Sequence, residues 1–180
     1  MIIQPDPTTE KHPPTLPDQY TAKQAVATFE AAFRWFFDSL IQDRGGLGEK
    51  IQRTPAELQQ RKEDSLRRMK QFLDFSGNPE QKFPAIHVAG TSGKGSTTMM
   101  ITDLLQGSGY KAAHHTSPFL QSPSEKLVYN GRWEKPSYCV ELFNDFDRLH
   151  QGWLDSQDEF TQVKYGEAWV WLTFWWMAKR

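Results

Sequence analysis

A glycine-rich run with one lysine and several hydroxyls has the residue types best suited to chemistry. It reads Gly90-Thr91-Ser92-Gly93-Lys94-Gly95-Ser96 and follows the apolar stretch 85–89. Glycines let the backbone turn tightly, so that successive N–H groups can reach anionic oxygens. Lys94 adds a full positive charge, and Ser96 adds a hydroxyl that can reach a magnesium ion. We therefore expect these seven residues to form a phosphate-binding loop.

The spacing of this loop departs from the common pattern G-x-x-x-x-G-K-[ST]. That pattern would place glycine at position 88 and a hydroxyl residue at position 95, where this chain has Val88 and Gly95. The alternative is an ordinary glycine-rich turn with a solvated lysine. Phosphate binding requires a strand before the loop and a helix after it, and the sequence predicts both. This context favours phosphate binding.

The loop resembles the G-T-N-G-K-G-S loop of the folylpolyglutamate and dihydrofolate synthases, which belong to the Mur ligase superfamily. Further stretches are similar to the T-S-P-H-L, E-R-I, N-G and G-N-P motifs of that family. They are Thr116-Ser117-Pro118-Phe119-Leu120, Glu125-Lys126-Leu127, Asn130-Gly131 and Gly77-Asn78-Pro79. The likeness runs from about Tyr20 to the last residue. Ser92 stands where the family has asparagine, and Phe119 stands where it has histidine, in the loop that lines the substrate cleft.

The resemblance implies an α/β fold with a P-loop and a Mur-ligase-like parallel sheet flanked by helices. It also implies an ATP-dependent ligase that adds glutamate to a folate or dihydropteroate carboxylate through an acyl phosphate. ATP and Mg²⁺ would be the cofactors, and a folate-type small molecule and glutamate the partners. Lys94 would be the catalytic residue, with Ser117 and Ser96 as magnesium ligands and Thr116 a weaker candidate.

Two alternatives stay open at this point. One is another Mur-type ligase, acting on a cell-wall peptide or an amino-acid polymer. The other is a nucleotide-binding module without catalysis, because the acidic and histidine magnesium ligands that the family places further along the chain have no counterpart here. A helix rich in tryptophan from Tyr165 onward also needs more surface than two sheet strands offer. We therefore expect residues 20–180 to be the N-terminal portion of a longer ATP-binding domain.

Several other polar and aromatic residues have simpler structural interpretations. His87, His114 and His115 are expected to be structural or solvated, and Cys139 to be a buried thiol. Glu167 aligns loosely with a family glutamate near the pterin pocket. The aromatic run Trp35-Phe36-Phe37 has the helical spacing of core residues rather than of a ligand shelf.

The composition of the chain narrows the functions that it can have. The 180 residues carry 21 Lys and Arg against 22 Asp and Glu, a formal net charge of −1. This balance provides no field that would attract nucleic acid or an anionic membrane. One cysteine excludes an internal disulfide and fits the cytoplasm. The apolar stretch 168–178 is shorter than the roughly 20 residues of a membrane span, and we expect a monomer.

The hydrophobic pattern predicts the elements that position these motifs. We expect helices over residues 21–42, from the capping box at Thr54 to Gly77, after the loop, over 136–152, and from Tyr165. In the second helix, Leu58, Leu66, Met69, Phe72 and Leu73 share one face. Strands are expected at 85–89 and 110–115, and a hairpin at 126–133 around Asn130-Gly131. Residues 1–19 read as a disordered leader.

Overall fold

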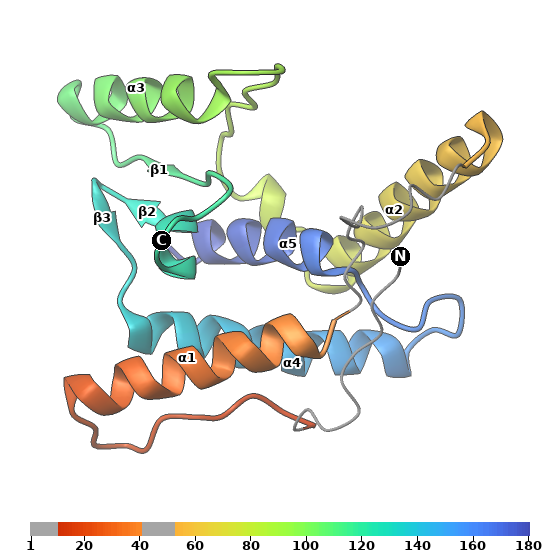
Figure 1. Ribbon diagram of the computed structural model, residues 1–180, viewed down its shortest axis with the longest axis horizontal. Helices are drawn as coiled ribbons and strands as arrows, with labels where there is room; N and C mark the ends of the chain where they lie inside the picture. Colours follow the sequence, from red (N-terminus) through yellow and green to blue (C-terminus); the bar gives the residue numbers. More distant parts are fainter. Residues whose placement is uncertain (1–10, 41–52) are drawn as a thin grey trace.

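A computed structural model describes residues 11–40 and 53–180, and helices dominate the described part (Figure 1). The helices are α1 (Ala22–Asp38), α2 (Pro55–Phe75), α3 (Lys94–Gly107), α4 (Pro136–Asp155) and α5 (Tyr165–Ala178). A 3₁₀ turn, η1 (Pro79–Gln81), lies between α2 and α3, and a second, η2 (Pro123–Lys126), lies between the first two of the short strands β1 (Ala113–His114), β2 (Val128–Tyr129) and β3 (Arg132–Trp133).

Local sequence signals set most helix boundaries. The Thr54 hydroxyl accepts a hydrogen bond from the Glu57 N–H at 3.2 Å, and the Glu57 carboxylate accepts the Thr54 N–H at 2.7 Å. This reciprocal capping box confirms the predicted start of α2. The predicted end of α4 at Gly152 is wrong, because the helix continues to Asp155. Gly152 lies next to the Phe75 ring of α2, where an added Cβ would be 3.4 Å from the ring.

An aromatic core lies between α1, α4, α5 and the end of α2. Phe36, Phe72, Phe146 and Trp171 are fully buried. The Phe72 and Trp171 rings stack with centroids 5.1 Å apart, which joins α2 to α5. The core interpretation of Trp35 and Phe36 is confirmed. Figure 1 shows α1 and α4 side by side, with α5 packed against α4.

The helices of this chain bury the tryptophans of α5. The indole N–H of Trp171 donates to the Ser76 hydroxyl at 2.7 Å, and that of Trp176 donates to Glu134 at 2.8 Å. Buried indoles usually find such a partner, since an unsatisfied donor is costly. The argument that these rings need further sheet surface is therefore wrong.

The predicted core face of α2 is only partly buried. Phe72 has no exposed surface, but Leu58 is 46% exposed and Leu66 is 73% exposed. Figure 1 shows why, because the first half of α2 extends away from the other helices. The helical spacing identified one face correctly, yet no other described helix covers its N-terminal half.

The described residues form an antiparallel sheet rather than the predicted parallel one. Strand order is β1-β2-β3, and both pairings are antiparallel. Residues 85–89 form no strand, and Ile86 is 64% exposed. A parallel pairing needs a crossover helix packed on the sheet, whereas a hairpin closes over a two-residue turn. Helix α3 exposes 72% of Leu104, so it does not supply that packing.

The predicted hairpin is confirmed. Asn130 and Gly131 have φ of +48° and +70°, the left-handed conformation that a tight hairpin turn requires. The Asn130 side chain also accepts the Ala112 N–H at 3.0 Å, which ties the turn to the residue before β1. Local turn chemistry was therefore sufficient to fix this element.

Residues 11–19, which we expected to belong to a disordered leader, lie against α4. Pro13 is buried, and Leu16 packs on the core. His12 Nδ1 lies 2.7 Å from the Asp147 carboxylate. The prediction of a first helix over 21–42 is wrong at its end, because α1 ends at Asp38 with Ser39 as its C-cap. Residues 1–10 and 41–42 lie outside the described residues. In the described part, no helix has the length and apolarity to cross a membrane.

Candidate functional site

The glycine-rich loop leads into the N-terminus of α3 with its backbone donors open. Gly93 precedes the helix with φ of +73°, a conformation that favours glycine. The first helical hydrogen bond runs from the Thr97 N–H to the Gly93 carbonyl at 2.9 Å. The N–H groups of Lys94, Gly95 and Ser96 therefore precede the helical ladder, and no side chain caps them. Together with the helix dipole, such donors favour an anion.

Lys94 lies over this loop. Its ammonium donates to the Gly90 carbonyl at 2.7 Å and to the Thr91 carbonyl at 3.4 Å, and the side chain is exposed. The positive charge of Lys94 therefore lies beside residues 90–91, close in sequence to the unbonded N–H groups at the start of α3. Residues 90–96 thus form a bend that leads into α3, without the strand that was expected before it.

Ser117, the other predicted magnesium ligand, lies in a separate loop after β1. Its peptide bond to Pro118 is cis, and its side chain is exposed. In the described part of the chain, no hydrogen bond or ion pair joins Ser117 to residues 90–96. Thr116 is half-buried beside it. The structure thus keeps Ser117 accessible without placing its oxygen against Ser96.

Hydrogen bonds to Glu125 hold the loop after β1 that contains Ser117, here called the Ser117 loop. This role of Glu125 was not predicted from the sequence. Its carboxylate accepts the backbone N–H groups of Leu120, Gln121 and Ser122, each at 2.8 Å. These bonds, first that from Leu120, lower the pKa of Glu125. The Ser-Pro-Ser-Glu capping pattern at 122–125 was the signal for this role.

Phe119, the departure from the family pattern, packs inward. Its ring meets that of Phe33 on α1 edge-on, with centroids 5.8 Å apart. The ammonium of Lys126 lies 5.8 Å from the same ring and 5.1 Å from the Trp169 ring. Burial lowers the pKa of Lys126. A cation and three aromatic side chains thus gather behind the Ser117 loop.

The histidines near this loop differ in environment. His115 Nδ1 lies 2.6 Å from the Thr173 hydroxyl, and burial, with smaller contributions from Lys126 and His114, lowers its pKa to about 4. Burial also lowers the pKa of His114, while His87 is exposed. Across residues 11–40 and 53–180, no group of three or more His, Cys, Asp or Glu side chains is arranged to hold a metal ion.

Glu167 is occupied by a buried ion pair. Its two carboxylate oxygens accept from the Arg68 guanidinium at 2.6 and 2.7 Å, and Ser65 donates at 2.7 Å. Both charged side chains are less than 10% exposed. Glu167 borders an open groove of about 930 Å³ between the first half of α2 and the start of α5. The carboxylate therefore joins α2 to α5, with its oxygens already bonded.

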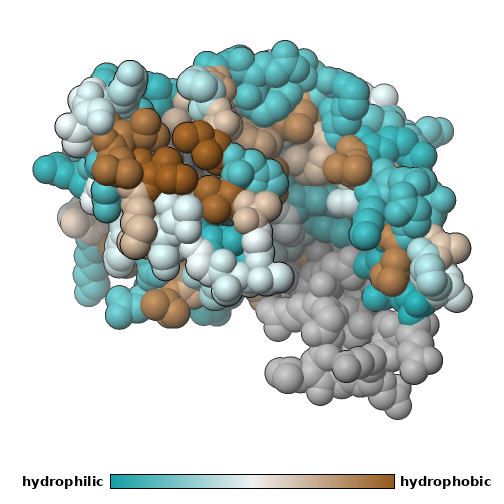
Figure 2. Space-filling view, turned by 90° about the horizontal axis from the view of Figure 1, so that it is seen from above, coloured by the Kyte–Doolittle hydropathy of each residue, from teal (hydrophilic) through white to brown (hydrophobic). Residues whose placement is uncertain are grey.

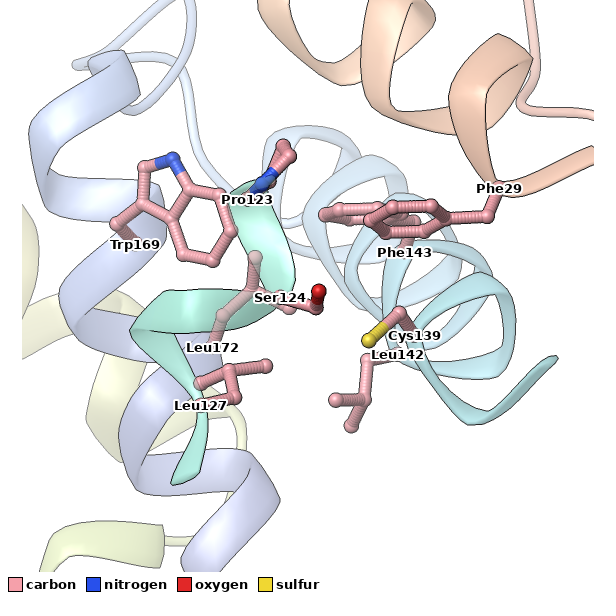
Figure 3. Close-up of a pocket in the computed structure, with 9 residues that line it drawn as sticks. All are labelled: Phe29, Pro123, Ser124, Leu127, Cys139, Leu142, Phe143, Trp169 and Leu172. Carbon is pink, nitrogen blue, oxygen red and sulfur yellow. The ribbon is translucent and has the colours of Figure 1, made fainter. Parts of the chain in front are cut away.

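A second, closed gap in the core is apolar and offers no binding site. Figure 3 shows side chains from α1, η2, α4 and α5 converging on it, with the Trp169 ring on one side and Phe29 and Phe143 on the other. It has no room for a water molecule. Cys139 lies at its edge, and burial raises the pKa of this thiol to about 12. The interpretation of Cys139 as a buried, unreactive thiol is confirmed.

Comparison with known proteins identifies relatives of this chain, although no family model matches it. It is 33% identical over 104 residues to the dihydrofolate synthase/folylpolyglutamate synthase of Mycobacterium tuberculosis, covering 58% of this chain and 21% of that protein. It is 47% identical over 66 residues to the Bacillus subtilis protein of the same name, covering 37% and 15%.

The fold agrees with these sequence matches. The structure of Mycobacterium tuberculosis folylpolyglutamate synthase complexed with ADP superimposes with a TM-score of 0.59 and 29% identity, over 64% of this chain and 26% of that one. The chain matches between 15% and 21% of the length of the two curated relatives. By sequence and by fold, this chain is similar to a part of the dihydrofolate synthases and folylpolyglutamate synthases.

Proposed function

We propose that this chain provides the nucleotide-binding part of an ATP-dependent ligase that adds glutamate to a folate or dihydropteroate carboxylate. The observation that carries the proposal is the open N-terminus of α3, where the N–H groups of Lys94, Gly95 and Ser96 project beside the Lys94 ammonium. The relatives named for this activity support it, as does the ADP in one of their structures.

The residues fit ATP and Mg²⁺. A Cβ on Gly93 would meet nothing within 4 Å, so the space beside the bend is free for an anion. Bound ATP would supply the phosphoryl group that activates the substrate carboxylate. The backbone donors would hold phosphate oxygens, and Lys94 would offset the charge that develops during transfer. The hydroxyls of Ser96 and Ser117 offer the hard oxygen ligands that Mg²⁺ prefers.

A titration with a nucleotide tests the loop directly. Binding of the Mg²⁺ complex of AMPPCP to the 180-residue chain is measured by calorimetry, in parallel with Lys94→Ala and Lys111→Ala. Lys111 is also exposed but lies before β1. Loss of a charged hydrogen-bond donor should weaken binding roughly 10- to 100-fold in Lys94→Ala, with Lys111→Ala unchanged. Equal affinities in all three proteins would remove the loop from the proposal.

Ligation is tested on the longest polypeptide that the gene encodes. Incorporation of labelled glutamate into dihydropteroate or folate, with release of ADP, would support the ligase. Transfer to a cell-wall peptide or an amino-acid polymer instead would assign another Mur-type reaction. Nucleotide binding without any transfer would favour the non-catalytic module.

A further inference from the structure

The carboxylate of Glu125 uses both of its oxygens to hold the Ser117 loop. Oε2 accepts the Leu120 N–H, and Oε1 accepts the N–H groups of Gln121 and Ser122, each at 2.8 Å. Three backbone N–H groups that converge on one point favour a negatively charged acceptor. The loop therefore binds the ionised form of Glu125.

Glu125 belongs to a well-packed part of the molecule, whereas the loop that it binds is exposed. Within η2, Pro123 and Ser124 are buried, and Leu127, which follows this turn, is 2% exposed and belongs to the aromatic core. Leu120 in the loop is 89% exposed. A close-packed turn keeps its position, because moving it would disturb the side chains around it. The carboxylate on η2 can therefore hold the exposed loop in one place.

Two contacts fix the chain immediately after Ser117. The Phe119 ring packs edge-on against Phe33 of α1, with centroids 5.8 Å apart. The next residue, Leu120, donates its N–H to Glu125. Ser117 precedes Leu120 by three residues, which span roughly 10 Å at most, and the intervening Pro118 has a φ fixed by its ring. The position of Ser117 therefore depends on these two contacts.

Glutamine, which has nearly the same shape, cannot replace Glu125 in this arrangement. Both carboxylate oxygens accept hydrogen bonds here. The amide of glutamine has one oxygen and one NH₂ group, and the NH₂ group donates instead of accepting. At least one of the three backbone N–H groups would therefore face another donor, and the negative charge that attracts all three would be lost. Glu125→Gln should release the loop from η2 without changing the size of the side chain.

We propose that Glu125 is a positioning residue for Ser117, and that its carboxylate, by fixing the Ser117 loop, sets how tightly the Mg²⁺ of a bound nucleotide is held. This inference rests on the proposed function, in which Ser117 is a ligand of that ion. Glu125 acts through the backbone of the loop and is not itself a ligand. Replacing a group that holds a metal ligand in place typically weakens metal binding roughly 10- to 100-fold.

The first test separates the metal ion from the nucleotide. Binding of AMPPCP to the 180-residue chain is measured by calorimetry, once with Mg²⁺ and once with EDTA. In Glu125→Gln the affinity with Mg²⁺ should fall roughly tenfold or more, whereas the affinity with EDTA should not change, because the backbone donors of α3 remain in place. Glu141→Gln, at an exposed position of α4, should match the unmodified chain in both conditions. Equal affinity of Glu125→Gln and the unmodified chain with Mg²⁺ would overturn the proposal.

A double variant distinguishes positioning from a separate structural role. If Glu125 acts through Ser117, the protein with both Ser117→Ala and Glu125→Gln should bind AMPPCP with Mg²⁺ no more weakly than Ser117→Ala alone. A role of Glu125 that does not involve Ser117 would add a loss of its own. Additive losses, or an unchanged affinity in Ser117→Ala, would contradict the proposal.

Amide hydrogen exchange gives a measurement on the unmodified chain, which decides the matter if Glu125→Gln does not fold. The amides of Leu120, Gln121 and Ser122 should exchange slowly for an exposed loop, because each donates to Glu125. AMPPCP with Mg²⁺ should slow their exchange further, and AMPPCP with EDTA should not. Exchange rates that do not respond to Mg²⁺ would mean that the loop is not coupled to the metal ion, and the proposal would fail.

The same measurements separate this inference from the proposed function. Failure of AMPPCP to bind the unmodified chain in either condition would refute the nucleotide site, and the role of Glu125 with it. Binding of AMPPCP that depends on Lys94 but is the same in Glu125→Gln and the unmodified chain would refute the role of Glu125 alone and leave the nucleotide site standing.

Discussion

The aromatic core and helix α3 bury their apolar residues very differently. In the core, Trp171 and Phe146 have no exposed surface. On α3, Met100 is 65% exposed and Leu104 is 72% exposed. Figure 2, viewed from the α3 side, shows this hydrophobic surface as a brown patch. Large apolar side chains are thus buried in the aromatic core and exposed to solvent on α3.

This difference shows what determines packing here. Helices α1, α4 and α5 present aromatic faces to each other, so each buries the residues of the next. Helix α3 buries Thr102, and its contact with the sheet runs through residues near Ala112, including a bond from Gln106. Met99, Met100 and Leu104 on this helix are each more than half exposed. Functional donors at its N-terminus therefore lie on a helix that contributes little to the core.

The largest expected effect is in the core. Trp171→Ala should destabilise the fold by about 4 kcal/mol, because it removes a fully buried ring stacked on Phe72. Chemical denaturation monitored by circular dichroism measures the change. Trp133→Ala is the control, since Trp133 is 55% exposed. Similar losses in the two variants would contradict the division between core and surface.

The buried ion pair should give the next largest effect. Arg68→Ala leaves the Glu167 carboxylate buried without its guanidinium, which should cost about 3 kcal/mol. Lys70→Ala, which breaks an exposed pair with Asp74 on the same helix, should not change the denaturation midpoint measurably. A small effect of Arg68→Ala would mean that α2 is joined to the core by Phe72 and its neighbours alone.

Acid should weaken the core through His150. Burial lowers its pKa to about 4, and its Nε2 accepts the Val163 N–H at 3.1 Å. Below about pH 6.5 the unfolded chain binds a proton that the folded protein excludes. Stability should therefore be fully present above pH 6.5 and decline between pH 6.5 and 4. We expect a loss of roughly 3 kcal/mol from this group.

A matched variant separates His150 from the other titrating groups. His150→Gln should show a flatter dependence of unfolding free energy on pH over the same interval, as measured by urea denaturation. The remaining slope would include His115, whose pKa is also lowered to about 4. An identical slope in the variant and the unmodified chain would exclude His150 as a source of acid sensitivity.

The smallest effect is expected on α3. Leu104→Gln should change stability by less than about 0.5 kcal/mol, because most of the side chain is already exposed. Differential scanning calorimetry measures it against Leu142→Gln, a buried leucine on α4. A large loss from Leu104→Gln would show that α3 is packed more extensively than its exposure indicates.

Local signals predicted more of this fold than long-range ones. The capping box at Thr54 and the turn at Asn130-Gly131 are decided by neighbouring residues, and both are confirmed. The parallel sheet depended on residues 85–89 pairing across a crossover, and neighbouring sequence contains no information about whether α3 packs well enough to support it. The prediction that Leu58 and Leu66 are core residues is wrong for the same reason. Helical spacing identifies the residues that share a face, but not whether another element covers that face.

The candidate site also has one part that the local sequence indicates and another part that depends on contacts distant in sequence. Residues 90–96 are consecutive, so the sequence alone indicates that they lie together at the start of α3. The Lys126 environment could not, because it joins η2 to Trp169 on α5 and to Phe119 in the loop. Nothing in the local sequence around Lys126 indicates that aromatic rings from elsewhere in the chain surround it.

The resting position of Lys94 affects how tightly an anion can be held. Its ammonium already donates hydrogen bonds to the carbonyl oxygens of Gly90 and Thr91. An ammonium has three N–H donors, so one remains for an incoming oxygen while the other two hold the side chain over the bend. The lysine is therefore positioned before an anion arrives, and little of its rotamer entropy is left to lose on binding.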